Sequence, residues 1–511
     1  MALSSTRRRH MATSTGERSG IRITDFAHSY AALPEGFFVR TRPTPVREPR
    51  LIRFNEPLAA DLGIDCGALD VEEMAQVFAG NLLPEGADPL AMAYAGHQFG
   101  QFVPQLGDGR ALLLGEVRDR GGAARDVQLK GSGRTPFSRG GDGRAALGPV
   151  LREYVVSEAM HALGIPGTRA LAAVTTGETV RRDGLLPGAI LTRVAASHVR
   201  VGTFQYFAAR GNIGAVRRLA DYVIDRHYPH VRDRERPYLS LLEAIGERQA
   251  LLIARWLHVG FIHGVMNTDN MAVAGETIDF GPCAFMDAYD PATVFSSIDG
   301  MGRYAYANQP HAAQWNLARL AETLLPLLDP DQARAVELAS EALSQFSARF
   351  EHAWLAGMRR KLGLLTDAPA DLDLIHAWLA LLHANRADYT LAFRSLGLAT
   401  VPGAGDASVR AQLADPAAFD EWAAHWRARL AAEPTDPPAR AEAMRTANPA
   451  VIPRNHRVEQ ALAAAVEHDD YVPFGELLEV LARPYEDDGR FQRYQEPPRP
   501  DERVLRTFCG T

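Results

Sequence analysis

Five polar side chains have the types needed to move a phosphate or nucleotide group. Lys130 ends an alternating polar and apolar run, Glu153 follows 23 residues later, and Asp269-Asn270 precede an Asp-Phe-Gly tripeptide that begins at Asp279. Such transfers need cations against phosphate oxygens, acids that hold Mg²⁺ and a base near the attacking hydroxyl. The pattern predicts a nucleotide-dependent transferase in which Glu153 positions Lys130. Amide and carboxylate oxygens suit Mg²⁺, so Asn270 and Asp279 are the predicted metal ligands and Asp269 the predicted base.

Each of these residues has a plainer interpretation when it stands alone. Glu153 is then a solvated glutamate in the first turn of a helix, where it complements the helix dipole. Asp269 is then a turn residue that caps its own backbone, and an isolated Asp-Phe-Gly arises by chance in long chains. The order of the five residues along the chain favours a shared site.

Lysine is rare in this chain, which contains Lys130, Lys361 and 53 arginines. Positive charge is therefore supplied almost entirely as arginine. A lysine ammonium is a compact point charge on a thin stem, whereas an arginine guanidinium is a wide planar fork. A narrow site against a phosphate is a place where that difference matters, which strengthens the hypothesis for Lys130.

The elements that would position these residues form a strand-rich part followed by a helical part. Alternation indicates strands, and an early proline with a later glycine brackets a helix. A glycine-rich loop over residues 131–144 follows the lysine strand, and a short hairpin is expected over 271–281. The expected strands are 111–117, 126–130, 169–175 and 189–195; the expected helices are 57–62, 71–78, 148–164, 241–258 and most of 311–480.

This order of elements predicts an α+β, protein-kinase-like bilobal fold with extensions at both ends. The expected division has a disordered N-terminus (1–20), an N-lobe with its extension (21–204), a helical C-lobe (205–480) and a surface tail that contains Cys509 (481–511).

Two features depart from an ordinary protein kinase. No G-x-G-x-x-G-x-V loop precedes the lysine strand, where Gly107-Asp108-Gly109-Arg110 is the nearest sequence, and Asp269 is directly followed by Asn270. Arg193 and Arg200 flank a strand-to-hinge segment. Each alone has a plain interpretation as a surface ion-pair residue, but together near a nucleotide they could grip phosphates bidentately.

The composition and charge of the chain argue against several classes of protein. The net charge of −7 does not favour nucleic-acid binding, and no apolar run reaches the length of a membrane span. The first twenty residues have no apolar core of a secretory signal, although their arginines leave a mitochondrial location open. Three separated cysteines, Cys66, Cys283 and Cys509, form no CxxC pair and indicate a reducing compartment.

Long blocks of the chain resemble the selenoprotein O (SelO) family of protein AMPylases, from about residue 25 to the end. The resembling segments include YAGHQFGQFVPQLGDGRALLLGE, DVQLKGSGRTPFSRGGDGRAALGPVLREYVVSEAMHALGIPGTRALA, HGVMNTDNMAVAGETIDFGPCAFMDAYDP and NPAVIPRNHRVEQALAAA. The resemblance implies transfer of AMP from ATP to protein hydroxyls, with Mg²⁺ or Mn²⁺ and with ATP flipped relative to kinases. It implies that Lys130, Arg193 and Arg200 hold the departing phosphates. It also implies nucleotide contacts from Gly107, Gly109, Arg110, Asp142, Gly143 and Asp279.

The resemblance further implies a redox role for Cys509, which corresponds to the selenocysteine position of some members. Its implied partner lies after Asp-Phe-Gly, where residues 292–297 hold no cysteine and Cys283 is the nearest thiol. The expected partners are ATP and hydroxyl-bearing proteins, redox-related ones among them, with neither nucleic acid nor membrane. A monomer is expected, in the cytoplasm of a bacterium or in mitochondria. Two alternatives stay open: a kinase that transfers the γ-phosphate, and a non-catalytic nucleotide-binding scaffold.

Overall fold

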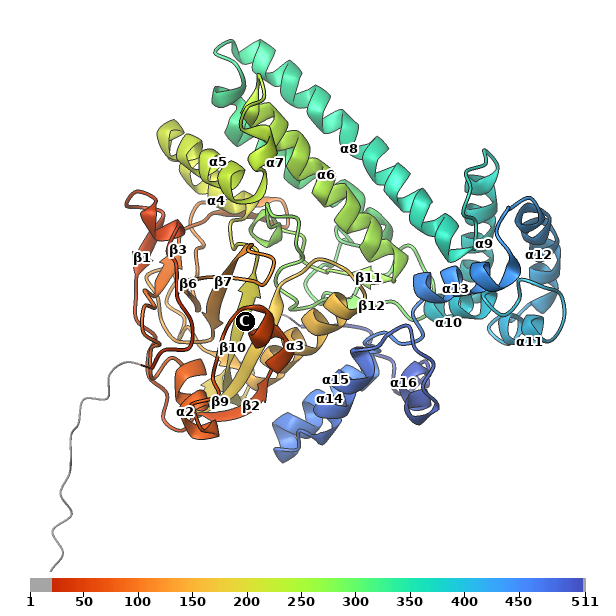
Figure 1. The fold of residues 1–511 in the computed structure, drawn as a ribbon, viewed down its shortest axis with the longest axis horizontal. Helices are drawn as coiled ribbons and strands as arrows, with labels where there is room; N and C mark the ends of the chain where they lie inside the picture. Colours follow the sequence, from red (N-terminus) through yellow and green to blue (C-terminus); the bar gives the residue numbers. More distant parts are fainter. Residues whose placement is uncertain (1–20, 509–511) are drawn as a thin grey trace, which may run out of the picture.

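The computed structural model describes residues 21–508, and these form a strand-rich part and a helical part (Figure 1). The main sheet has the strand order β1-β3-β6-β7-β10-β9-β2, with β8 paired to β10, and its neighbours are antiparallel. The strands are β1 (Phe38–Arg40), β2 (Arg50–Phe54), β3 (Leu90–Met92), β6 (Ala111–Arg118), β7 (Ala124–Lys130), β8 (Ala145–Ala146), β9 (Arg169–Arg181) and β10 (Leu185–Ala195). The four expected strands are confirmed. The last two extend farther, because β9 and β10 continue pairing up to their connecting turn.

One helix, α3 (Leu147–Ala162), packs against β9 and β10 of the sheet. Its other side is covered by α14 (Asn455–His468) and α15 (Val472–Leu481), which come from the far end of the chain (Figure 1). Because α3 is covered on both sides, Glu153 near its middle is only 4% exposed. A buried carboxylate needs partners, and the site supplies them.

The helical part is built on three long helices, α6, α7 and α8, that pack against one another (Figure 1). Smaller helices gather at the far end of α8. The helices are α1 (Glu56–Asp61), α2 (Val71–Phe78), α4 (Val201–Ala208), α5 (Ile213–His227), α6 (Pro237–His258), α7 (Gln309–Leu328), α8 (Gln332–Lys361), α9 (Asp371–Asn385), α10 (Tyr389–Leu396), α11 (Ala404–Arg410), α12 (Pro416–Ala431), α13 (Pro437–Ala447) and α16 (Gln492–Gln495). Together with the sheet they confirm the expected α+β bilobal class. Within the described residues, no helix is long and apolar enough to cross a membrane.

The loop that contains Asp269 and Asn270 lies between β11 (Phe261–Ile262) and β12 (Ala284–Phe285) and includes the 3-10 turn η3 (Thr268–Asn270). The hairpin expected over residues 271–281 is present only in reduced form, as one antiparallel bridge between Met271 and Thr277. The backbone of Thr277 bonds instead to Pro166 and Thr168. Backbone hydrogen bonds to the loop after α3 thus take the place of those expected between the two strands of the hairpin.

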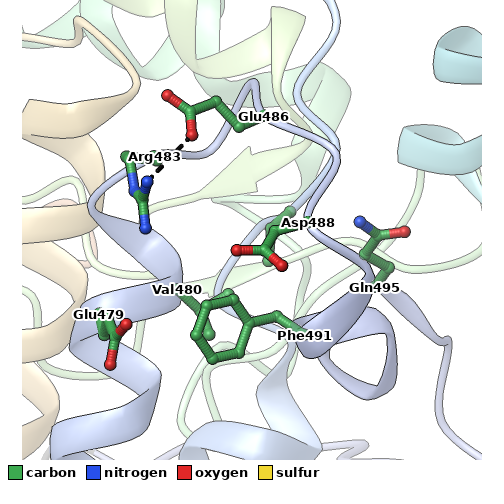
Figure 2. Close-up of a pocket in the computed structure, with 8 residues that line it drawn as sticks. Glu479, Val480, Arg483, Glu486, Asp488, Phe491 and Gln495 are labelled. Carbon is green, nitrogen blue, oxygen red and sulfur yellow. Dashed lines mark ion pairs between the residues drawn. The ribbon is translucent and has the colours of Figure 1, made fainter.

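The tail after α15 is anchored at two places. At the first, Nη2 of Arg394 on α10 donates to the carbonyl of Tyr485 at 3.1 Å, in the segment where Arg483 pairs with Glu486 (Figure 2). The hollow there encloses about 10 Å³, room for about one water molecule, so it is no ligand site. At the second anchor, Thr507 is 2% exposed and pairs with Ser296, beyond Asp-Phe-Gly. The end of the described tail is therefore held against the segment after Asp-Phe-Gly by the backbone of Thr507.

Candidate active site

A cleft of about 750 Å³ is lined both by the sheet and by the loop that contains Asp269 and Asn270. That volume suits a nucleotide-sized ligand. Glu153 does not line it and lies behind Lys130. The predicted residues that line the cleft are Gly107, Gly109, Arg110, Lys130, Asp142, Gly143, Arg193, Arg200, Asp269, Asn270 and Asp279.

Lys130 connects three elements at the back of the cleft. It is the last residue of β7, and its Nζ lies 2.5 Å from Oε2 of Glu153 and 2.7 Å from Oδ1 of Asp279. Burial alone would raise the pKa of Asp279, but the ammonium of Lys130 holds it well below its usual range. Asp279 is therefore a carboxylate, in a left-handed backbone conformation with φ +67°.

Arg193 is the second cation on Glu153. It lies on β10 opposite Gln128 of β7, and its Nη1 donates to Oε1 of Glu153 at 3.2 Å. Its Nη2 donates to Oε1 of Gln128 at 2.5 Å. One carboxylate thus orients both Lys130 and Arg193, so the two cations are held by paired, hydrogen-bonded contacts.

Arg200 directly precedes α4 and also lines the cleft. Its guanidinium lies 4.3 Å from the ring centroid of Tyr94, and its Nη2 is 3.7 Å from Oδ1 of Asp108. Its Nη1 donates to the backbone oxygen of Asp269 at 3.2 Å. Arg200 is therefore held beside the predicted base, where it lines the cleft.

Asp269 lies in η3, where its side chain is almost fully enclosed and is 7% exposed. Burial, opposed by Arg200, raises the pKa of this carboxyl to about 6. Its neighbour Asn270 donates Nδ2 to the carbonyl of Val265 at 3.0 Å. That bond fixes the amide, and it leaves the acceptor atom Oδ1 of Asn270 as the atom suited to a metal ion.

Glycines allow the loops around the cleft to approach closely. A Cβ on Gly107 would lie 2.3 Å from the Phe137 ring, and one on Gly143 would lie 2.1 Å from the oxygen of Gly133. Both have positive φ, which L side chains rarely adopt. Asp142 accepts two hydrogen bonds from Arg182, at 2.9 and 3.2 Å.

Sequence reasoning missed several residues that line the same cleft. Tyr94, Gln98 and Asp108 lie in a segment that the resemblance quoted without assigning roles to them. The signal that could have found the missed arginines is their density around the glycine-rich loop and the turn after β9. The missed lining residues include Tyr94, Gln98, Asp108, Phe137, Arg139, Arg144, Arg181 and Arg182.

Comparison with known proteins identifies the family. A profile described as protein adenylyltransferase SelO matches residues 22–482. The chain belongs to the SelO family. Two relatives named protein nucleotidyltransferase YdiU, from Rhizobium rhizogenes and a Bradyrhizobium species, are each 64% identical over 486 residues. The alignments span 95% of this chain and 97% and 99% of the respective relatives. A Rhizobium meliloti protein of the same name is 63% identical over 95% of this chain and 99% of its own.

Membership confirms the resemblance and the enzyme class: the protein is a protein adenylyltransferase, for which ATP is the nucleotide substrate. The non-catalytic alternative is thereby set aside.

The donor set of the SelO cleft fits Mg²⁺. Asn270 and Asp279 offer an amide and a carboxylate oxygen, and the described residues contain no cluster of three His, Cys, Asp or Glu side chains that could enclose a metal ion. Mg²⁺ characteristically takes one or two protein ligands and completes its shell with substrate phosphates and water. Two protein oxygens beside a nucleotide-sized cleft match that preference.

Cys283 follows Asp279 by four residues and does not line the cleft. It is fully buried, its Sγ lies 3.4 Å from the oxygen of Phe280, and burial raises the pKa of its thiol to about 12. It is therefore held as a neutral thiol. Cys509 lies outside the described residues, so the Cys283–Cys509 pairing stays a prediction.

Proposed function

We propose that the protein transfers AMP from ATP to Ser, Thr and Tyr hydroxyl groups of proteins, with ATP bound flipped and with Mg²⁺ or Mn²⁺. The observation that carries the proposal is the arrangement of Lys130, Arg193 and Arg200 around one cleft that also contains Asp269. An ordinary kinase places one such lysine against its phosphates. Two additional buried arginines suit a leaving group that carries two phosphates.

In the proposed reaction, the acceptor oxygen attacks the α-phosphorus and the bond from that phosphorus to the bridging oxygen breaks. Pyrophosphate leaves, and its charge is neutralised by Lys130, Arg193 and Arg200. Asp269 takes the proton of the acceptor hydroxyl. Asn270 and Asp279 would hold the metal ion, which supplies further charge neutralisation at the phosphates.

The rest of the cleft would bind the nucleotide. Gly107 and Gly109 permit close approach of the backbone, and Arg110, Asp142 and Gly143 complete the proposed contacts. A cytoplasmic location is part of the proposal, because the relatives named above come from bacteria.

Two samples of ATP, labelled at the α- or the γ-phosphate, test the proposal with Mg²⁺ and a bacterial lysate. Asp279→Ala is the inactive control, and Asp373→Ala, an exposed aspartate of α9, is the matched substitution. Label from α-labelled ATP alone, lost in Asp279→Ala and kept in Asp373→Ala, is expected. Label from γ-labelled ATP alone would instead make the protein a kinase.

A further inference from the structure

A small hairpin outside the main sheet packs on the loop that carries Asp269. It consists of β4 (Gly96–Gln98) and β5 (Gln101–Val103), joined by Phe99 and Gly100. Both turn residues have positive φ, 51° and 85°, as the tight type I′ hairpin turn requires. The hairpin contacts η3 and α4, and the sequence reasoning gave it no role.

Backbone groups of the hairpin bind the residues just before Asp269. The amide of His97 donates to Oγ1 of Thr268 at 2.7 Å, and the amide of Phe99 donates to Oδ1 of Asn267 at 2.9 Å. Both acceptors are buried and have further partners: Oγ1 of Thr268 donates to Gln205, and Oδ1 of Asn267 accepts from Tyr304. The hairpin is thus tied to the catalytic loop by a connected polar network rather than by apolar contact alone.

Two residues of β4 meet the carboxylate of Asp269 itself. Nε2 of Gln98 lies 3.5 Å from Oδ2, a long contact of the kind that tightens when substrates bind. A Cβ on Gly96 would lie 2.5 Å from Oδ1, so only glycine leaves room for that oxygen. Oδ1 is buried and has no hydrogen-bond partner among residues 21–508. Oδ1 is therefore enclosed against Gly96, and Oδ2, the oxygen that Gln98 contacts, is the one left to face the cleft, which Gln98 and Asp269 both line.

We propose that the β4–β5 hairpin positions the catalytic base: Gly96 leaves the space that encloses Oδ1 of Asp269, and the amide of Gln98 holds Oδ2 in the direction of the acceptor hydroxyl. Gln98 is thereby a positioning residue, which acts through Asp269. This inference rests on the proposed function, in which Asp269 is the base.

A positioning role and a merely structural role differ in what they change. If Gln98 only stabilised the fold, its loss would reduce the amount of active enzyme, whatever residue occupies position 269. If Gln98 acts through the carboxylate, its loss lowers the maximal rate without changing the ATP concentration for half-maximal rate. In that case, the loss of Gln98 does not lower the rate further in a protein whose Asp269 carboxylate has already been removed.

The test measures AMP incorporation from α-labelled ATP into lysate proteins over a range of ATP concentrations. Gln98→Met keeps the length of the side chain and removes its hydrogen bond. Gln101→Met is the matched control, because Gln101 is opposite Gln98 in the hairpin and is exposed. Gly96→Ala is a second variant, which crowds Oδ1 directly. Thermal unfolding of each variant accompanies the rates.

The expected loss of maximal rate is about ten-fold for Gln98→Met and at least as large for Gly96→Ala, since a well-placed base contributes about 10²–10⁴-fold. The half-saturating ATP concentration stays within about two-fold. Gln101→Met keeps the wild-type rate. On an Asp269→Asn background, Gln98→Met leaves the residual rate unchanged.

Two results would overturn the inference while the proposed function stands. In the first, Asp269→Asn abolishes AMP incorporation but Gln98→Met keeps the wild-type rate. In the second, Gln98→Met lowers the rate by the same factor in the Asp269→Asn protein as in the wild-type protein. Full activity of Asp269→Asn would overturn the inference together with the assignment of the base. No incorporation from α-labelled ATP by the wild-type protein would contradict the proposed function itself, and the inference with it.

Discussion

The Nζ atom of Lys130 lies 2.5 Å from Oε2 of Glu153, so the strand lysine and the helix glutamate are in direct contact. The same Nζ contacts Asp279 at 2.7 Å. A single compact ammonium thus joins β7, α3 and the Asp-Phe-Gly segment. In a chain whose other cations are almost all arginines, the identity of this residue has a testable consequence.

We expect Lys130→Arg to lower AMP transfer on the order of a hundred-fold, although the charge is kept, because the planar guanidinium cannot replace a point charge between two carboxylates. The measurement is the rate of incorporation from α-labelled ATP. Lys361→Arg, at the other lysine of the chain, should retain transfer per folded molecule. Wild-type activity of Lys130→Arg would show that charge alone suffices at this position.

Arg226 gives a prediction on stability. It lies on α5 of the helical part, and it pairs with Glu116 of β6 at 2.8 Å and with Asp126 of β7 at 2.6 Å. All three side chains are buried. Arg226→Met leaves two buried carboxylates without this cation, which should lower the free energy of unfolding by about 3–5 kcal/mol.

Urea unfolding followed by tryptophan fluorescence measures that change. Arg218→Met is the matched control, because Arg218 is an exposed arginine of the same helix, and it should change stability by less than about 0.5 kcal/mol. Equal urea midpoints of unfolding for the two variants would show that the buried ion pairs make no net contribution to the free energy of unfolding.

The strands, the main helices and the set Lys130, Glu153 and Asp279 could be predicted because local signals and their order agree. Alternation, a proline at a helix start and an Asp-Phe-Gly tripeptide each act over a few residues. The bilobal class followed from the change in periodicity near residue 205.

Features that depend on distant partners could not be predicted. The 271–281 hairpin is reduced to one bridge because Thr277 bonds to the loop at 166–168, more than a hundred residues away. The contact of Gln98 with Asp269 joins positions 171 residues apart. Local pattern gives no information on which loop will close over another. The packing of α14 and α15 on α3 was missed for the same reason.

Metal removal gives a third prediction. Asn270 and Asp279 are the proposed ligands, so dialysis against EDTA should abolish AMP transfer, and added Mg²⁺ or Mn²⁺ should restore it. Asn270→Ala should raise the metal concentration needed for half-maximal rate by about ten-fold or more, since an oxygen ligand is lost. A metal titration of transfer rate decides this, and full activity in EDTA would contradict the proposed role of both residues.

Lys361, the second lysine, gives a prediction on pH. It ends α8, is 2% exposed and lies 4.3 Å from the ring centroid of Phe393 and 5.3 Å from that of Tyr389. No carboxylate of the described residues pairs with it. Burial lowers the pKa of this ammonium from 10.5 to about 7. His258 nearby stays neutral above pH 5, because burial lowers its pKa to about 4.

Below pH 7 the ammonium is charged in both folded and unfolded molecules, so the full free-energy cost of burying this charge opposes folding. Between pH 7 and 10.5 folded molecules release the proton while unfolded molecules keep it, so rising pH favours the folded state. Lys361→Met should therefore be more stable than wild type at pH 6, and the advantage should shrink by about 2–4 kcal/mol toward pH 10. Measuring the free energy of unfolding at both pH values tests this. Arg360→Met is the control, because Arg360 is exposed and its substitution should change stability by the same amount at both pH values. An advantage of Lys361→Met that does not change with pH would mean that Lys361 keeps an ordinary pKa in the folded protein.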